Sequence, residues 1–149
     1  MQQQTSPSVH FHENSIIHLK LFYEQNWYDK EFFAEDRGEV AWQLVCKTPV
    51  DNSLSKDWPE QQALISKDDE VPSAQVMVYT IIGHFFAIGE RLFEKVYVRT
   101  SSIASGGSRV NVGSFDRSGL DIRSNLDGGR YGNVGLASSM KVPELNLEN

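Results

Sequence analysis

Cysteine is almost absent from this chain, which has 149 residues and a single cysteine, Cys46. One cysteine excludes an internal disulfide framework and every zinc site that needs several thiolates. An excess of basic residues is also missing, since 14 Lys and Arg stand against 20 Asp and Glu and the net charge is −6. Without that excess there is little to displace the counterions of a phosphate backbone. We therefore expect neither thiol chemistry nor nucleic-acid binding.

A long hydrophobic run is missing as well. The most apolar stretch, Val76 to Ile88, is interrupted by Gly83 and His84 and is shorter than the ~20 residues that span a bilayer. The first residues, Met1 to Ser8, have neither the basic start nor the apolar core of a secretory signal. These features predict no membrane span and no export by the usual route.

The chain has the length and composition of one globular domain. Its 149 residues are 40% hydrophobic and 23% charged, which is close to the average for folded proteins. Residues 1–14 are expected to be a flexible leader and residues 143–149 a frayed tail, which leaves a single domain over residues 15–142. Eight of the 11 glycines lie between Gly106 and Gly135, so we expect helices in the first part and a strand-and-loop second part. This segregation predicts the α+β class.

Two helices are expected in the first part. Asp57 is placed to cap a helix from Trp58 to about Ile65. Ser73 is placed to cap a stronger helix from Ala74 to about Ile88, and Gly89 supplies its left-handed end. The buried face of the second helix is expected to carry Met77, Ile81, His84, Phe85 and Ile88.

The remaining periodic stretches are rich in β-formers. The first apolar stretch, Ser15 to Tyr23, could be a strand or a short helix, because its periodicity does not decide. Strands are expected at Val40 to Val45, Lys95 to Thr100, Arg109 to Val112, Gly119 to Arg123 and Val134 to Met140.

The second part has an unusual composition. From Ser101 to Ser139 it contains no Lys, Glu, Gln, Met or Trp, although these five types make up 32 of the 149 residues. On overall composition, roughly eight would be expected in this stretch. Turn-rich segments prefer Gly, Ser, Asn and Asp, and this accounts for the glycines. It does not account for the presence of several arginines in a stretch without any lysine, or of aspartates in a stretch without any glutamate.

A second interpretation starts from the genetic code. The five missing types are amino acids that codons ending in a pyrimidine cannot encode. Randomising the first two bases of asparagine-type codons would produce the mixture of Arg, Ser, Asp, Gly, Tyr and Asn found here. The composition alone leaves both interpretations open.

The order of residues in this stretch favours the second interpretation. The chain contains Gly106-Gly107-Ser108, then Arg117-Ser118-Gly119-Leu120, then Gly129 to Leu136 (GRYGNVGL). This order resembles the closing segment of the C-type-lectin-fold variable proteins of diversity-generating retroelements, which is related to the C-terminal region of formylglycine-generating enzymes. The resemblance covers about the last third of the chain.

The resemblance implies a C-type-lectin-like fold whose rigid scaffold holds variable side chains for recognition of a protein or cell-surface target. A period-two strand would let one face vary while the other face holds the core. The expected apolar anchors are Val110, Val112, Phe115, Leu120, Ile122, Val134 and Leu136. The expected ligand-binding residues, which should point outward, are Ser114, Asp116, Arg117, Ser118, Asp121, Arg123, Ser124, Asn125, Asp127, Arg130, Tyr131 and Asn133. Short polar side chains with a Tyr and several Arg suit an adaptable binding surface.

Other candidate sites have simpler structural interpretations. His10 and His12 could place two imidazoles on one face of a strand, as zinc binding requires, but no third ligand is fixed. We therefore expect no metal site there. Asp116, Asp121 and Asp127 are separated by turns and form no EF-hand pattern, so the sequence does not decide on calcium. His84, Cys46, Trp27, Trp42 and Trp58 are expected to be core residues.

Three functions follow from these features. The leading hypothesis is a non-catalytic binding protein with a diversified C-terminal surface and no cofactor. The alternative is a phage or prophage tail-associated receptor-binding protein, which would use the same surface, so the location is the cytoplasm or a phage particle. An enzyme related to formylglycine generation is disfavoured, because paired cysteines carry that family's chemistry and only Cys46 is present.

Overall fold

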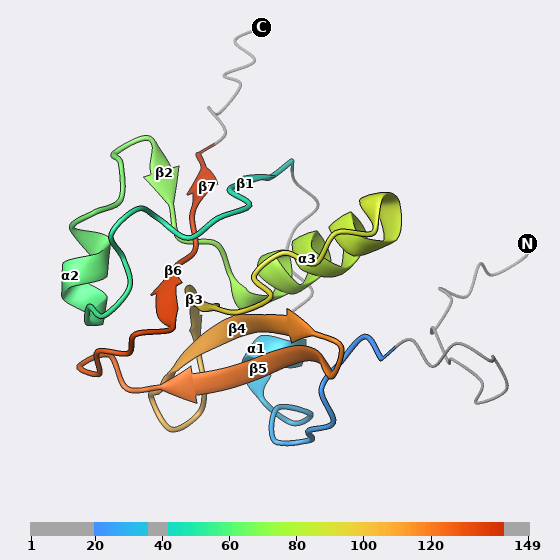
Figure 1. Ribbon diagram of the computed structural model, residues 1–149. Helices are drawn as coiled ribbons and strands as arrows, with labels where there is room; N and C mark the ends of the chain where they lie inside the picture. The colour runs from blue at the N-terminus through green and yellow to red at the C-terminus, as the bar shows by residue number, and fades with distance from the viewer. Residues whose placement is uncertain (1–19, 36–41, 142–149) are drawn as a thin grey trace, which may run out of the picture.

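The computed structural model describes residues 20–35 and 42–141 (Figure 1). The expected leader and tail, His10, His12 and most of the Ser15 to Tyr23 stretch lie outside the described residues. The elements in chain order are α1 (Phe32–Glu35), β1 (Leu44–Val45), α2 (Trp58–Gln62), β2 (Asp69–Glu70), α3 (Ala74–Ile88), β3 (Tyr97–Ile103), β4 (Arg109–Asp116), β5 (Gly119–Asn125), β6 (Val134–Leu136) and β7 (Ser139–Met140). The fold is α+β, with its helices before the main strands.

Helix α3 has the bounds that its capping residues predict. The Ser73 hydroxyl accepts a hydrogen bond from the Val76 amide at 3.2 Å, and Gly89 ends the helix with φ 79°. Met77 and Ile81 are buried, and His84 and Phe85 are half-buried. The prediction that Ile88 is buried was wrong: it is 67% exposed, because the last turn of α3 projects beyond the strands (Figure 1).

Helix α2 is shorter than expected. Asp57 caps it as predicted, since its carboxylate accepts from the Glu60 amide at 3.0 Å. After Gln62 the backbone continues in tighter turns, in which the Leu64 amide donates to the Gln61 carbonyl at 3.0 Å. Such i to i−3 bonds end the α-helix before Ile65.

The main sheet has the strand order β5-β4-β3-β6. The three longer strands are antiparallel, and β6 pairs with β3 in parallel. Val98, Val112 and Ile122 are directly opposite one another on successive strands. The strands β3, β4 and β5 start within two residues of the predicted positions and extend further than predicted. The prediction of one strand from Val134 to Met140 was wrong, because the chain leaves β3 after Leu136 and then pairs with β1 and β2 as the separate strand β7. The smaller sheet has the order β1-β7-β2.

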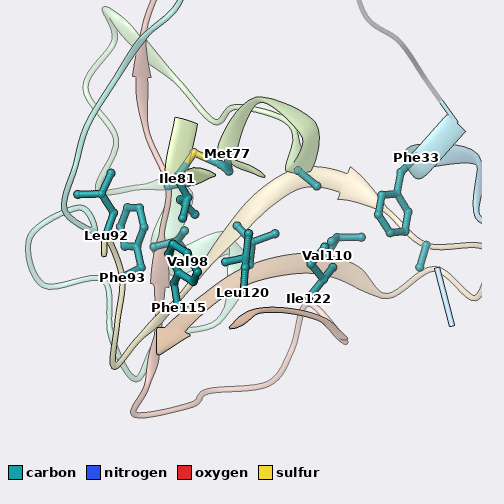
Figure 2. Close-up of a cluster of buried hydrophobic side chains, with 14 residues drawn as sticks. Phe33, Met77, Ile81, Leu92, Phe93, Val98, Val110, Phe115, Leu120 and Ile122 are labelled. Carbon is teal, nitrogen blue, oxygen red and sulfur yellow. The ribbon is translucent and has the colours of Figure 1, made fainter. Parts of the chain in front are cut away.

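One face of the main sheet packs against α3 and forms the hydrophobic core (Figure 2). Val98, Val110, Leu120 and Ile122 contribute from the strands, beneath Met77 and Ile81 of the helix (Figure 2), and Val112 belongs to the same cluster. All seven expected apolar anchors are buried, which confirms that part of the prediction. Val134 and Leu136 are buried outside this cluster.

Residues outside the main sheet were predicted less well. Cys46 is exposed beside the two-residue strand β1, so its assignment to the core was wrong. Trp42 is 89% exposed and Trp27 is exposed as well, which also contradicts a core role. Trp42 lies beside β1, and a strand of two residues at the edge of a small sheet has too little neighbouring chain to cover a side chain of that size. Trp58 is half-buried.

The outer edge of β5 is covered by the stretch before α1. The Tyr23 amide donates to the Leu120 carbonyl at 2.9 Å, and the Leu120 amide donates to the Leu21 carbonyl at 2.8 Å. Further along, the Trp27 indole donates to the Ile122 carbonyl at 3.0 Å. This edge is therefore closed to strand addition at these positions. No helix within the described ranges is both long and apolar enough to cross a membrane.

Candidate functional site

The second face of the main sheet carries polar side chains. Tyr97 and Arg99 of β3, Arg109 and Asn111 of β4, and Asp121, Arg123 and Asn125 of β5 share it, and we call it the polar face. The expectation that this side would be free to vary was wrong for β4, because Arg109 and Asn111 are buried. Helix α2 and residues 126–133, which we call the covering loop, lie beside it (Figure 1).

Arg99 attaches the covering loop to strand β3 through hydrogen bonds. Its side chain is fully buried, and its Nη2 donates to the Gly129 carbonyl at 2.6 Å. Its Nη1 donates to the Lys56 carbonyl at 2.9 Å and to the Gln61 side chain at 3.1 Å. Burial lowers the pKa of Arg99 from its ordinary value, although the nearby Asp127 charge opposes this. Arg99 therefore joins α2 and the loop to β3.

Arg109 makes a second connection. Its Nε donates to the Asp127 carboxylate at 2.9 Å and its Nη2 donates to the other oxygen at 3.2 Å. The guanidinium carbon lies 3.7 Å from the ring centre of Trp58. Such a bidentate pair stacked on an indole uses both the fork and the flat face of arginine. Asp127 therefore fixes the covering loop to β4, and it is also a half-exposed member of the expected ligand-binding residues.

Main-chain groups of the covering loop complete its attachment. The Trp58 amide donates to the Asp127 carbonyl at 2.9 Å, and the Ser55 amide donates to the Tyr131 carbonyl at 3.0 Å. Arg130 pairs with Asp57 at 3.0 Å and with Glu60 on the protein surface. The hydrogen bond between Arg130 and Glu60 raises the pKa of the arginine and lowers the pKa of the glutamate.

Asp121 lies inside the polar face rather than on its surface. Its Oδ2 accepts hydrogen bonds from the Tyr97 hydroxyl at 2.5 Å and from Arg123 Nε at 2.8 Å. The prediction that Asp121 points outward was wrong: it is 5% exposed, because Tyr97 reaches it across Gly113, which has no side chain. Burial and the hydrogen bond to Asp121 raise the pKa of Tyr97 to about 12.

The other expected site residues fall in two places. At the turn between β4 and β5, Arg117 and Ser118 are exposed, Ser114 and Asp116 are half-buried, and the Ser118 amide donates to Asp116 at 2.8 Å. On β5 and the covering loop, Arg123, Arg130, Tyr131 and Asn133 are exposed, while Ser124, Asn125 and Asp127 are half-buried. Arg123, Asn125 and the residues of the covering loop therefore lie on or beside the polar face, whereas Ser124 is opposite Val110 and lies on the other face of the sheet.

The sequence interpretation missed the buried polar residues that support this surface. Arg99, Arg109, Asn111 and Trp58 were not among the expected site residues, and Tyr97 was counted only as part of a strand. The sequence did contain a signal for two of these residues. Tyr97 and Arg99 alternate with valines in KVYVRT, which indicates that they share the strand face opposite the valines. Leu126, which is 66% exposed in the covering loop, was also missed.

The aspartates of the expected site do not form a cluster. The three aspartates of the expected site are engaged separately, with the Ser118 amide, Tyr97 and Arg109. In the part of the chain that the structure describes, no three His, Cys, Asp or Glu side chains gather as a metal site would require. Comparisons with family models, with curated proteins and with solved structures found no match to this chain.

Proposed function

We propose that this chain is a non-catalytic ligand-binding protein with a C-type-lectin-like fold, which presents a diversified C-terminal surface to a protein or cell-surface target. The observation that carries the proposal is the way the covering loop is held. Its main-chain carbonyls at Asp127, Gly129 and Tyr131 bond to groups elsewhere in the fold, whereas Tyr131 and Asn133 expose their side chains. Such side chains can change while the loop keeps its position.

The chemistry of the exposed set supports the same proposal. Tyr131 and Leu126 offer apolar area, and the exposed side chains of Arg123 and Asn133 offer hydrogen-bond donors and acceptors. Rigid aromatic anchors with short polar neighbours are typical of surfaces that bind proteins. The absence of Lys and Glu from Ser101 to Ser139 agrees with diversification through the codons of asparagine.

Two matched libraries would test the proposal. The first randomises five exposed residues, and the second randomises five buried or anchoring residues of the same region. The exposed positions are Arg117, Ser118, Arg123, Tyr131 and Asn133. The anchoring positions are Arg99, Arg109, Asn111, Asp121 and Asp127.

Both libraries are displayed, scored for protease resistance and then selected against one probe protein, hen lysozyme. Most members of the exposed library should resist proteolysis and yield specific binders, because surface substitutions rarely change stability by more than about 0.5 kcal/mol. Most members of the anchoring library should be cleaved, because they leave buried polar groups unpaired. Equal cleavage of the two libraries, or a folded exposed library without binders, would contradict the proposal.

A further inference from the structure

Helix α3 is apolar on two sides. From Ala74 to Ile88 it contains no Asp, Glu, Lys or Arg, although 23% of the residues in the chain are charged. One side of the helix packs on the main sheet through Met77 and Ile81. A helix that is hydrophobic all round is normally buried all round. The other side of α3 therefore has the composition of a contact surface.

We call this second side the outer face of α3 and define it as Gln75, Tyr79, Ile82, Gly83 and Phe86. Their spacing is i, i+4, i+7, i+8 and i+11, which places them on one side of an α-helix. Tyr79 is 78% exposed and Phe86 is 58% exposed. The outer face therefore leaves two large aromatic side chains in water.

Gly83 lies near the middle of the outer face and is not required by the packing of its own chain. A Cβ atom at this position would meet nothing within 4 Å in the described part of the chain. Glycine is also less favourable than alanine inside a helix. A glycine that has this cost without an internal reason is expected where a second backbone approaches closely.

A hollow of about 280 Å³ opens beside the N-terminal half of the outer face. Phe22, Tyr28, Val78 and Tyr79 are among the side chains that line it. A cavity of about 150 Å³ is large enough to hold benzene, so this hollow has room for a phenyl ring. Phe86 presents such a ring at the C-terminal half of the same face. The surface therefore carries a hollow at one end and an aromatic side chain of suitable size at the other.

We propose that the outer face of α3 binds the outer face of a second copy of this chain, packed antiparallel across a two-fold axis. Phe86 of each copy then enters the hollow of the other copy, so the contact is made twice. Ile82 is midway between Val78 and Phe86, and the axis passes beside its neighbour Gly83. The two backbones therefore cross where Gly83 has no side chain to separate them.

A second copy fits this surface better than an unrelated protein does. An unrelated partner would need both a hollow and an aromatic side chain at matching positions, whereas a second copy brings both. Two copies that each have a net charge of −6 repel each other over most of their surface. The outer face is free of Asp and Glu, so the copies can meet there without placing like charges in contact.

This arrangement would make the binding protein bivalent. Helix α3 packs against one face of the main sheet, and the polar face is the other one. Association through α3 therefore leaves the polar face of each copy uncovered, on opposite sides of the pair. Two linked binding surfaces bind a target that has several epitopes more tightly than one surface does. The association itself is measured without any target, so its failure would leave the proposed function untouched.

Sedimentation equilibrium of the full chain tests the inference. Phe22, Tyr79 and Phe86 together leave roughly 350 Å² of aromatic surface exposed, which is about half of what each partner of a standard interface buries. We therefore expect reversible dimers with a dissociation constant in the micromolar range, measured between about 1 μM and 1 mM. A chain that stays monomeric throughout would mean that another protein or other residues of the chain cover α3, and would overturn the inference.

Two variants and a control locate the contact. Phe86→Lys removes the inserted ring and should leave only monomers over the same range. Gly83→Ala places a methyl group at the crossing and should raise the dissociation constant about tenfold, although alanine is the better helix former. Ile88→Lys puts the same charge on a residue that is 67% exposed but lies on the other side of the helix, so dimers should persist.

The melting temperatures of the three variants in dilute solution show whether each monomer folds. All three substituted residues are exposed, so these temperatures should stay close to that of the unmodified chain. Dimers that survive both Phe86→Lys and Gly83→Ala would show that the copies meet elsewhere. Dimers that Ile88→Lys dissolves as completely as Phe86→Lys would show that the outer face is not the contact. Either result would overturn the inference.

Discussion

The guanidinium of Arg109 lies 3.7 Å from the ring centre of Trp58, and the same side chain holds both oxygens of Asp127. Strand β4, helix α2 and the covering loop therefore meet at one arginine. Lysine has neither the planar fork nor the flat face that these contacts use. We therefore expect the stability of the protein to depend on Arg109 more than on an exposed arginine such as Arg117.

Replacing Arg109 by lysine should therefore destabilise the protein. The loss is expected to be about 1 to 3 kcal/mol, since a charge-assisted hydrogen bond and the cation–π contact both disappear. Urea denaturation measures the change in the free energy of unfolding. Arg117→Lys is the matched control, because Arg117 is exposed and should change stability by less than about 0.5 kcal/mol. Equal effects of the two substitutions would show that the connection through Arg109 is not structural.

The core should respond most strongly at Phe115. This side chain is fully buried, and its ring lies 5.3 Å from that of Phe85 in an edge-on contact. Phe115→Ala should cost about 3 to 5 kcal/mol. Phe86→Ala, on the exposed side of α3, should cost much less. Thermal denaturation compares the stability of the two variants directly. Similar losses of stability would mean that the core has been assigned to the wrong face of α3.

How well the sequence predicts this fold depends on the range of the interactions. The bounds of α3 follow from Ser73 and Gly89, which act on their own helix ends, and these were predicted correctly. Burial of Asp121 depends on Tyr97, and the role of Asp127 depends on Arg109. Those partners are distant in the sequence, so periodicity and local propensity carry no information about them. The outward orientation was therefore predicted correctly for residues such as Arg117 and Tyr131, and wrongly for Asp121, which a distant side chain covers.

A glycine within the expected variable region should resist substitution. A Cβ atom at Gly113 would lie 2.2 Å from the Val96 carbonyl oxygen, and the residue has φ 152°. Gly113→Ala should therefore lower the melting temperature by several degrees, because a loss of about 1 kcal/mol or more has that effect in a chain of this size. Gly106→Ala is the control, since a Cβ there meets nothing within 4 Å. Equal melting temperatures would contradict the close approach of Gly113 to Val96.

The pairing of Tyr97 with Asp121 predicts an effect at high pH. The pKa of Tyr97 is raised from 10.0 to about 12, so the folded state holds the phenolic proton more tightly than the unfolded state does. The stabilisation is complete below pH 10 and is lost as the pH rises through 12. Burial also raises the pKa of Tyr28, so the test is the difference between wild type and Tyr97→Phe: absorbance titration of the phenolate should show a tyrosine that ionises near pH 12 in the wild type and is missing in the variant. A wild-type curve that differs from the variant curve only near pH 10 would refute the pairing.

Diversification by a retroelement would change the exposed polar residues of this region and keep the buried ones constant. Sequencing the genomic locus tests it most directly. We expect a reverse transcriptase gene and a near-copy of the segment that encodes Ser101 to Ser139. Mismatches between copy and gene should fall on template adenines, in codons for exposed residues such as Arg117, Tyr131 and Asn133, and should spare Val110, Val112 and Phe115. The absence of any copy, or mismatches on the apolar codons as often as on the polar ones, would contradict the account.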